Sequence, residues 1–181
     1  MINSVRIIIP LVFALVIGTV AKASVVQAPT INQCFTDLTQ SYIQQTALLT
    51  WANEATVATY TFNFVNYNTQ FQSISNYFTP EGWETFHDKL TGSDIFKFMI
   101  DKKLLITAVT TKAPIILKQG VLNGHYSWRV QMPLLVTYQS STEWTHETLM
   151  VTMVIERTAP YEGIKGIRVV ELTAEQVEDK K

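Results

Sequence analysis

The feature that most constrains the fold is an unbroken alternation of side chains from His125 to Gln139. One set of alternate positions is apolar: Tyr126, Trp128, Val130, Met132, Leu134, Val136 and Tyr138. The intervening set is more polar and includes Arg129 and Gln131. Successive side chains of a β-strand point to opposite faces of its sheet, so this pattern predicts a long antiparallel strand with one buried face.

The segments on either side of this strand can be aligned with it, and both alignments select the same buried face. Asn123-Gly124 fits a two-residue hairpin turn, which pairs Leu122 with His125. Counting outward sets Val121, Leu117 and Ile115 beside Tyr126, Val130 and Met132. A four-residue turn over 140–143 sets Leu149, Val151, Met153 and Ile155 opposite Leu134, Met132, Val130 and Trp128. A slip of one residue would turn either set toward water.

Two prolines conflict with an uninterrupted ladder. In these alignments Pro114 and Pro133 fall opposite each other, where two backbone hydrogen bonds would be exchanged. Proline has no N–H to donate, so we expect a bulge or a splay of the strands there.

The residues before the sheet have helical periodicity. Apolar spacing of three and four predicts one long or kinked helix over 32–63, and a second helix around Phe71, Ile74 and Phe78. Thr79 fits an N-cap, with Pro80 at the first position of a third helix that ends at Gly92-Ser93. The remaining elements expected are a short helix over 94–103, a strand over 104–111 that bends at Pro114 and continues to Leu122, a last strand over 164–172, and a polar tail over 175–181.

These elements predict an α+β fold in which N-terminal helices pack on a curved, about four-stranded antiparallel sheet. We expect a single domain over 32–174, preceded by a linker over 24–31. A chain of this length can bury about two thirds of its unfolded surface in one core.

The first 23 residues are organised as a signal peptide. Arg6 precedes an apolar stretch over 7–21, which ends in the small-residue step Ala21-Lys22-Ala23. As a helix, fifteen residues rise only about 22 Å, against about 30 Å for the hydrocarbon core. We favour cleavage after Ala23 and a periplasmic product. The alternatives are cleavage after Val26-Gln27-Ala28 and an uncleaved anchor that leaves the domain in the periplasm, attached to the inner membrane.

Charge and cysteine content exclude some classes of partner. Removal of residues 1–23 changes the formal charge from −1 to −3, and the basic residues are scattered, so we expect no direct nucleic-acid partner. Cys34 is the single cysteine, so an intrachain disulfide is impossible. We interpret Cys34 as a small apolar residue on a helix. The alternatives are an intermolecular disulfide, incidental exposure and, last, a nucleophile.

The reactive residues are few and badly spaced for joint action. His125 and His146 lie at opposite ends of the predicted hairpin and cannot share a metal ion, and His87 stands alone. Zinc-ligand spacings, glycine-rich phosphate loops and nucleophile motifs are absent from the sequence. We therefore predict no enzyme, no cofactor and no metal site. Arg129 and Gln131 on the less apolar strand face, together with Trp144, are the candidate partner contacts.

Three stretches resemble the IcmL/DotI family of type IVB secretion systems, which is related to conjugation proteins. They are NFVNYNTQFQSISNYFTPEGWETF (63–86), KAPIILKQGVLNGHYSWRVQMPLLVTYQSS (112–141) and LMVTMVIERT (149–158). The resemblance implies a nuclear-transport-factor-like arrangement of helices on a curved antiparallel sheet. It also implies a non-enzymatic role in assembling an envelope-spanning complex, with other secretion-system subunits and further copies of the chain as partners. Family members typically carry a cytoplasmic stretch before a membrane helix, whereas here the apolar segment begins at Ile7.

Two other functions remain open at this point. A free periplasmic domain of the same fold could bind a small ligand, which requires a closed apolar pocket with a few convergent polar groups. An isomerase-like or dehydratase-like enzyme would require a buried carboxylate or histidine facing a cavity. The predicted apolar core face supplies no such residue.

Overall fold

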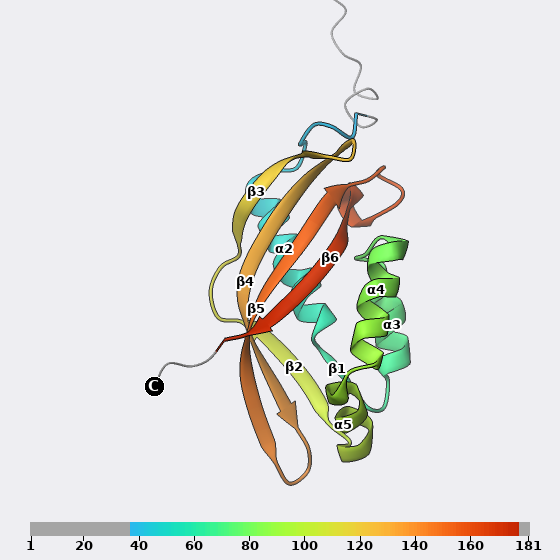
Figure 1. The fold of residues 1–181 in the computed structure, drawn as a ribbon, viewed down its shortest axis with the longest axis vertical. Coiled ribbons are helices and arrows are strands. Elements are labelled where there is room, and N and C mark those ends of the chain that lie inside the picture. The colour runs from blue at the N-terminus through green and yellow to red at the C-terminus, as the bar shows by residue number, and fades with distance from the viewer. Residues whose placement is uncertain (1–36, 178–181) are drawn as a thin grey trace, which may run out of the picture.

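The computed structural model describes residues 37–177, which form an α+β fold with helices on one side of a curled antiparallel sheet (Figure 1). The helices are α2 (Gln45–Thr59), α3 (Tyr67–Ser75), α4 (Pro80–Thr91) and α5 (Asp94–Lys102), with a 3-10 turn at Ile164–Gly166. The strands are β1 (Phe62–Asn63), β2 (Leu105–Thr110), β3 (Ile115–Leu122), β4 (His125–Gln139), β5 (Trp144–Arg157) and β6 (Ile167–Gln176). The predicted fold class is confirmed.

The alternating segment is β4, the strand around which the sheet is built. The strand order is β1-β2-β4-β5-β6, and β3 also pairs with β4. β2 pairs with the C-terminal part of β4 and β3 with its N-terminal part, so they form one interrupted strand along the same edge. The predicted continuation past Pro114 is therefore confirmed. Six strands lie in this part of the chain, rather than about four, because β1 adds a two-residue pairing and the interruption divides one strand in two.

The predicted β4–β5 register is confirmed. Leu149, Val151, Met153 and Ile155 pair with Leu134, Met132, Val130 and Trp128. All eight side chains except Leu149 are buried, because this face of the sheet packs against the helices. The four-residue turn over 140–143 is present, with Gln139 paired to Trp144.

The predicted β3–β4 register is correct only next to the turn. Leu122 pairs with His125 and Val121 with Tyr126, but a bulge between Ile116 and Lys118 shifts the pairing by one residue. Ile116 therefore takes the place beside Val130 that Leu117 was expected to take. Ile115 pairs with Gln131, which sends its side chain to the face opposite the core, where it is 55% exposed.

The proline conflict is resolved by a break rather than by a bulge at the prolines themselves. Pro114 lies outside both β2 and β3, in the connection that separates them. Pro133 pairs with Met150 on β5, and its carbonyl accepts from the Thr111 N–H at 3.0 Å. A residue without an N–H is tolerated at such an interruption because no ladder donor is lost.

The prediction of one helix over 32–63 is wrong for the described residues. Residues 37–44 are not helical, because the Asp37 carboxylate accepts from the Thr39 N–H at 2.9 Å and from the Gln40 amide at 2.8 Å. Such side-chain contacts compete with helical hydrogen bonds. At the other end the helix stops at Thr59, since Phe62 and Asn63 pair with β2.

The helix predicted from the Thr79 cap begins where expected. Thr79 is the N-cap of α4, its Oγ1 accepting from the Gly82 N–H at 3.1 Å, and Pro80 is the first helical residue. Gly92 ends this helix and Ser93 caps α5. The predicted last strand begins three residues early and ends four residues early, because residues 164–166 form a 3-10 turn and β6 continues to Gln176. The predicted polar tail therefore includes two strand residues, Glu175 and Gln176.

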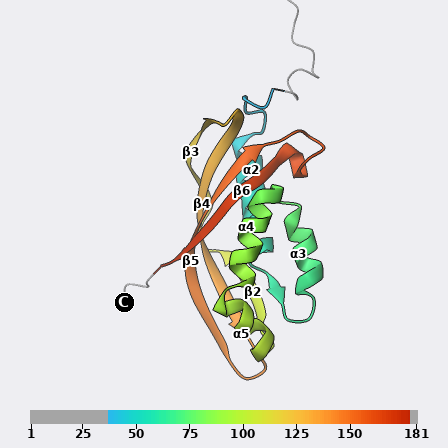
Figure 2. The same cartoon turned by 45° about the vertical axis from the view of Figure 1, so that its right-hand side comes forward.

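One core lies between the sheet and the helices. α2 contributes Leu48, Trp51, Ala52 and Ala55, all fully buried. Phe71 of α3 is the centre of an aromatic cluster, with ring-centre distances of 5.4 Å to Phe62 and 6.0 Å to Trp83. α3 and α4 lie together beside the sheet in Figure 2, and α4 packs against β6. No helix of the described residues lies on the opposite face of the sheet.

Candidate interaction surface

Within residues 37–177 no helix covers the side of the sheet that faces away from α2–α5, and we call this side the helix-free face. In Figure 1, α2 lies behind the strands and this face is turned toward the viewer. The register assigns alternate residues of each strand to it. They include Leu105 and Val109 (β2), Ile115, Lys118 and Leu122 (β3), Arg129, Gln131, Pro133 and Leu135 (β4), Trp144, Met150, Val154 and Glu156 (β5), and Glu171 and Glu175 (β6).

Large apolar side chains are exposed along the helix-free face. Leu105 is 41%, Val109 55%, Leu122 56% and Trp144 67% exposed, in addition to Ile115. Single exposed apolar residues are normal on any protein, but several on one face indicate a surface that another molecule covers.

All three predicted contact residues lie on the helix-free face. Arg129 is exposed and sits between Lys118 and Val154 on the neighbouring strands. The Gln131 side-chain amide donates to Thr152 Oγ1 at 3.1 Å, which fixes its orientation. Trp144 lies at the far end of the same sheet, opposite Gln139, with its ring stacked on His146 at 5.5 Å. Ten residues of strand separate the rows of Arg129 and Gln139, about 33 Å, so the three residues mark one extended face rather than one cluster.

A shallow groove of about 380 Å³ lies on this face at the break between β2 and β3. Its lining includes Lys112, Ile115, Gln131, Pro133, Met150 and Val177. The groove exists because the chain leaves the sheet at Pro114 and exposes the β4 and β5 side chains that a continuous strand would flank. It is mostly apolar, which suits an apolar side chain of a partner.

Sequence reasoning missed the exposed apolar residues of β2 and β3. Ile115 was assigned to the core because the bulge at Leu117 has no mark in the sequence. Leu122 could have been found, since the Asn123-Gly124 turn alone places it opposite His125 on the outward face.

Charges on the helix-free face are not evenly distributed. The basic side chains of Lys118 and Arg129 lie on β3 and β4, whereas β6 carries Glu171 and Glu175 together with one basic residue, Arg168. Glu156 is half-buried on β5, and its burial raises the pKa of this carboxyl, an effect that the nearby His125 partly opposes. The His125 Nδ1 to Glu156 Oε2 distance is 4.0 Å.

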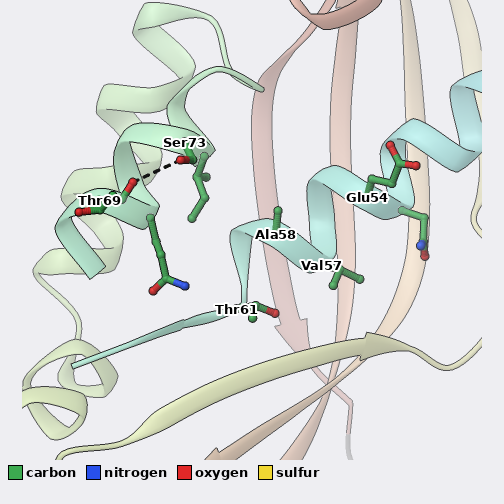
Figure 3. Close-up of a pocket in the computed structure, with 9 residues that line it drawn as sticks. Glu54, Val57, Ala58, Thr61, Thr69 and Ser73 are labelled. Atoms are coloured by element: carbon green, nitrogen blue, oxygen red, sulfur yellow. Dashed lines mark hydrogen bonds between the residues drawn. The ribbon is translucent and has the colours of Figure 1, made fainter. Parts of the chain in front are cut away.

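A second concavity, of about 540 Å³, lies between α2 and α3 (Figure 3). Glu54, Val57 and Ala58 come from α2, and Thr69 and Ser73 come from α3. The hydroxyl of Ser73 donates to the Thr69 carbonyl at 3.3 Å, so it is used within its own helix. The side chains that line this groove supply no cluster of titratable groups for catalysis.

A third concavity, of about 760 Å³, lies between α5 and the β4–β5 hairpin. Tyr138 and Glu147 line it, and the Tyr138 hydroxyl donates to the Glu147 carboxylate. Burial, together with this hydrogen bond and the charge of Glu147, raises the pKa of Tyr138. Burial also raises the pKa of the neighbouring Tyr60. Both phenols are therefore neutral donors at physiological pH and poor general bases.

The three histidines are separate, as expected. His87 packs edge-on against Phe71 at 5.6 Å, His125 Nδ1 lies 2.8 Å from the Arg157 carbonyl, and His146 stacks on Trp144. Within residues 37–177 no group of three histidine, cysteine, aspartate or glutamate side chains could hold a metal ion. None of the helices in that range is long and apolar enough to cross a membrane. The predicted leader, the linker and Cys34 lie outside the described residues.

The sequence matches a known protein family over most of its length. Residues 20–176 match the family model described as a type IVb secretion system inner-membrane complex component. This chain belongs to the DotI/IcmL family. No curated protein sequence matches the chain.

Solved structures agree with this family membership. The periplasmic domain of DotI is 46% identical, covers 76% of this chain and 100% of its own, and superimposes with a TM-score of 0.72. An IcmL-like type IV secretion system protein from Legionella pneumophila is 28% identical, covering 78% of this chain and 99% of its own, with a TM-score of 0.70. A periplasmic fragment of TraM, at 21% identity, covers 74% of this chain and 98% of its own and shares the fold with a TM-score of 0.68.

More distant structures define the wider fold class. VirB8 of Agrobacterium tumefaciens is only 8% identical, covers 78% of this chain and 100% of its own, and shares the fold with a TM-score of 0.53. The DotI/IcmL domain of this chain is thus a VirB8-like variant of helices on a curled sheet. Its family is one of secretion-system structural components with a periplasmic domain.

Proposed function

We propose that this chain is a non-enzymatic assembly component of a type IVb secretion system, and that it acts in the periplasm through its helix-free face. The observation that carries the proposal is that this face exposes a series of large apolar side chains over β2, β3 and β5. Exposed apolar area on a monomeric domain promotes nonspecific association, so we expect another protein to cover this face.

Family membership supports the partner class. Other subunits of the inner-membrane complex are the expected partners, since the family is one of components of that complex. The charged and polar side chains that frame the apolar residues, Arg129 and Gln131 among them, would supply specificity at the rim of such a contact. We propose that a cleaved signal peptide delivers the chain to the periplasm; the alternative is that residues 7–21 attach it to the inner membrane.

The experiment is cross-linking of the full chain, tagged at its C-terminus, in its own host, followed by mass spectrometry of the copurified proteins. The wild-type chain is expected to recover other secretion-system subunits. Val109→Asp and Trp144→Asp place a charge on the helix-free face and are expected to reduce that recovery. Tyr161→Asp is the matched control, because Tyr161 is 87% exposed but lies in the loop before β6. Equal recovery from all four chains would exclude the helix-free face as the contact surface.

A second candidate function is the binding of a small ligand in the cleft between α5 and the β4–β5 hairpin. The cleft combines apolar Ile95 and Phe98 with the polar pair of Tyr138 and Glu147. A TraE structure of similar fold was determined with a bound pyridine carboxylic acid. Ligand binding would be favoured over assembly if the chain emerged from its host alone and a compound library raised its thermal unfolding temperature in a Tyr138-dependent way.

A further inference from the structure

Basic and acidic residues are segregated across the sheet. Residues 105–139, which span β2, β3 and β4, contain three basic residues, Lys112, Lys118 and Arg129, and no acidic residue. Residues 144–176, which span β5, β6 and the loop between them, contain five acidic and three basic residues. On the helix-free face the β3 edge therefore carries the positive charge of Lys118, and at the β6 edge Glu171 and Glu175 outnumber Arg168.

One row of laterally paired residues on the helix-free face runs from β3 across β4 and β5 to β6. Lys118 pairs with Arg129, Arg129 with Val154, and Val154 with Glu171. Three strand spacings separate Lys118 from Glu171, about 14 Å, which is too far for an ion pair within one chain. Among residues 37–177, the ion pairs found include none of these three charged side chains.

We propose that a second copy of this chain packs on the helix-free face, related to the first by a two-fold axis that runs parallel to the strands between β4 and β5. The inference deepens the proposed assembly function and rests on it. Rotation about such an axis keeps each residue at its height along the strands but exchanges β3 with β6 and β4 with β5. Lys118 of each copy then faces Glu171 of the other, and each β3 edge faces a β6 edge.

The same rotation brings apolar side chains together. Pro133 on β4 pairs with Met150 on β5, so Pro133 of each copy faces Met150 of the other. Val109 lies beside Leu135, and the Val177 N–H donates to Thr148, the residue opposite Leu135. Val109 and Val177 are thus at one height near opposite edges, and the rotation sets them against each other. An apolar centre with a charged rim is the usual anatomy of a specific interface.

The alternative two-fold axis, perpendicular to the strands, is disfavoured by the same charges. With that axis at the height of the Lys118 row, β3 would face β3, and Lys118 and Arg129 of both copies would form one repulsive cluster. At any other height Lys118 would still not face Glu171, because this rotation does not exchange β3 with β6. Two sheets that pack face to face keep their strands within about 30° of each other, about 10 Å apart. That separation lets long charged side chains at the edges meet while the apolar residues fill the middle.

Cysteine cross-linking tests the orientation. In a Cys34→Ser background, chains carrying Lys118→Cys or Glu171→Cys are produced separately and together in the host and treated with a thiol cross-linker shorter than about 10 Å. A covalent dimer is expected when both cysteines are present and not from either single variant. Cross-linking by the Lys118→Cys chain alone would overturn the proposed axis, and the lack of any dimer would overturn the contact.

Charge reversal tests the pairing. Lys118→Glu and Glu171→Lys are each expected to raise the dimer dissociation constant of the purified full chain about tenfold, because each sets like charges together. The double variant, which restores opposite charges, is expected to return to within about threefold of the wild type. Lys89→Glu and Glu84→Lys make the same charge changes at exposed positions on α4 and should have no effect. Sedimentation equilibrium provides the measurement.

Two outcomes of these experiments separate this inference from the function on which it rests. A wild-type chain that is monomeric, or a double variant no better than the singles, refutes the second copy as occupant. Recovery of other secretion-system subunits in the host would then still support the assembly function through a different partner on the same face.

Discussion

Arg157 and Tyr42 are joined by a cation–π contact, with the guanidinium carbon 4.1 Å from the centre of the tyrosine ring. Arg157 is the last residue of β5 and is fully buried. Its guanidinium also donates to the carbonyls of Asp37 and, at 2.8 Å, of Gln40. The Tyr42 hydroxyl donates to the Lys165 carbonyl at 2.5 Å. The segment that precedes α2 is therefore held against the end of the sheet by a buried cation, together with the hydrogen bonds from Tyr42 to Lys165 and from the Tyr126 N–H to the Leu38 carbonyl.

Replacement of Arg157 should both destabilise the domain and release this segment. Arg157→Met keeps the apolar part of the side chain but leaves two carbonyls without their donor, so we expect a loss of about 2–4 kcal/mol in the free energy of unfolding. Urea denaturation measures the loss, and hydrogen exchange over residues 37–44 reports the release. Arg129→Met, at an exposed position, should change the stability by less than about 0.5 kcal/mol. Unchanged exchange over 37–44 in Arg157→Met would mean that other contacts hold the segment.

Gly82 allows α4 to approach β6. A Cβ atom at this position would lie 2.6 Å from the Val170 carbonyl oxygen and 2.9 Å from that of Val169. Both are backbone atoms of the strand, so they cannot move aside as a flexible side chain would. Gly82→Ala is expected to cost about 1–3 kcal/mol of stability, because the helix must shift away from the sheet.

Gly92→Ala is the matched control for Gly82→Ala. Its Cβ would have the Asp88 carbonyl at 3.1 Å as its single close neighbour, and its φ of −78° suits any residue. We expect a change in stability of about 0.5 kcal/mol or less in either direction. Thermal unfolding of the two variants side by side checks the pair, and equal losses would show that α4 does not depend on its close approach to β6.

The sheet could be predicted from sequence where both partners carry the period-two pattern. The β4–β5 register was predicted correctly over its core residues, because an error of one residue would bury polar side chains. The β3 register failed beyond Leu117, since a bulge depends on the tertiary environment and not on a particular residue. The helix over 32–63 was overpredicted for a similar reason. Asp37 and Asn63 are used for turns and strand pairing, which apolar spacing does not reveal.

The candidate site was predictable only in part. The less apolar face of β4 identified Arg129 and Gln131, and Trp144 was a candidate contact at the start of the next strand. That these three residues share a face with Val109 and Leu105 depends on the pairing of β2 with β4, across a connection of 14 residues from Thr110 to His125. A non-local pairing of this kind is not encoded in any short segment.

The N-cap of α4 should contribute measurably to the stability of the domain. Thr79 Oγ1 accepts from the Gly82 N–H, one of the four donors that a helix leaves unpaired at its start. Thr79→Ala should reduce the stability by about 1 kcal/mol, whereas Thr79→Ser keeps the acceptor and should retain most of it. Urea midpoints of the two variants decide the question. Equal losses would assign the effect to packing of the threonine methyl group rather than to capping.

Glu156 should make the stability of the domain depend on pH. Burial raises the pKa of this carboxyl in the fold, so folding favours its protonated form. The folded state binds more protons than the unfolded state between the ordinary and the raised pKa, and the wild type therefore loses stability as the pH rises through that interval. Glu156→Gln removes this dependence, because the amide stays neutral.

The comparison of wild type and Glu156→Gln across pH tests this directly. Below the ordinary glutamate pKa the two chains should be nearly equally stable, and above the raised pKa the Gln variant should be the more stable by a constant amount. Thermal unfolding at a series of pH values measures the difference. Glu175→Gln, at an exposed position on β6, is the control and should change the stability by less than about 0.5 kcal/mol at every pH. Parallel curves for the wild type and Glu156→Gln would mean that water reaches the carboxylate and that its burial carries no free-energy cost.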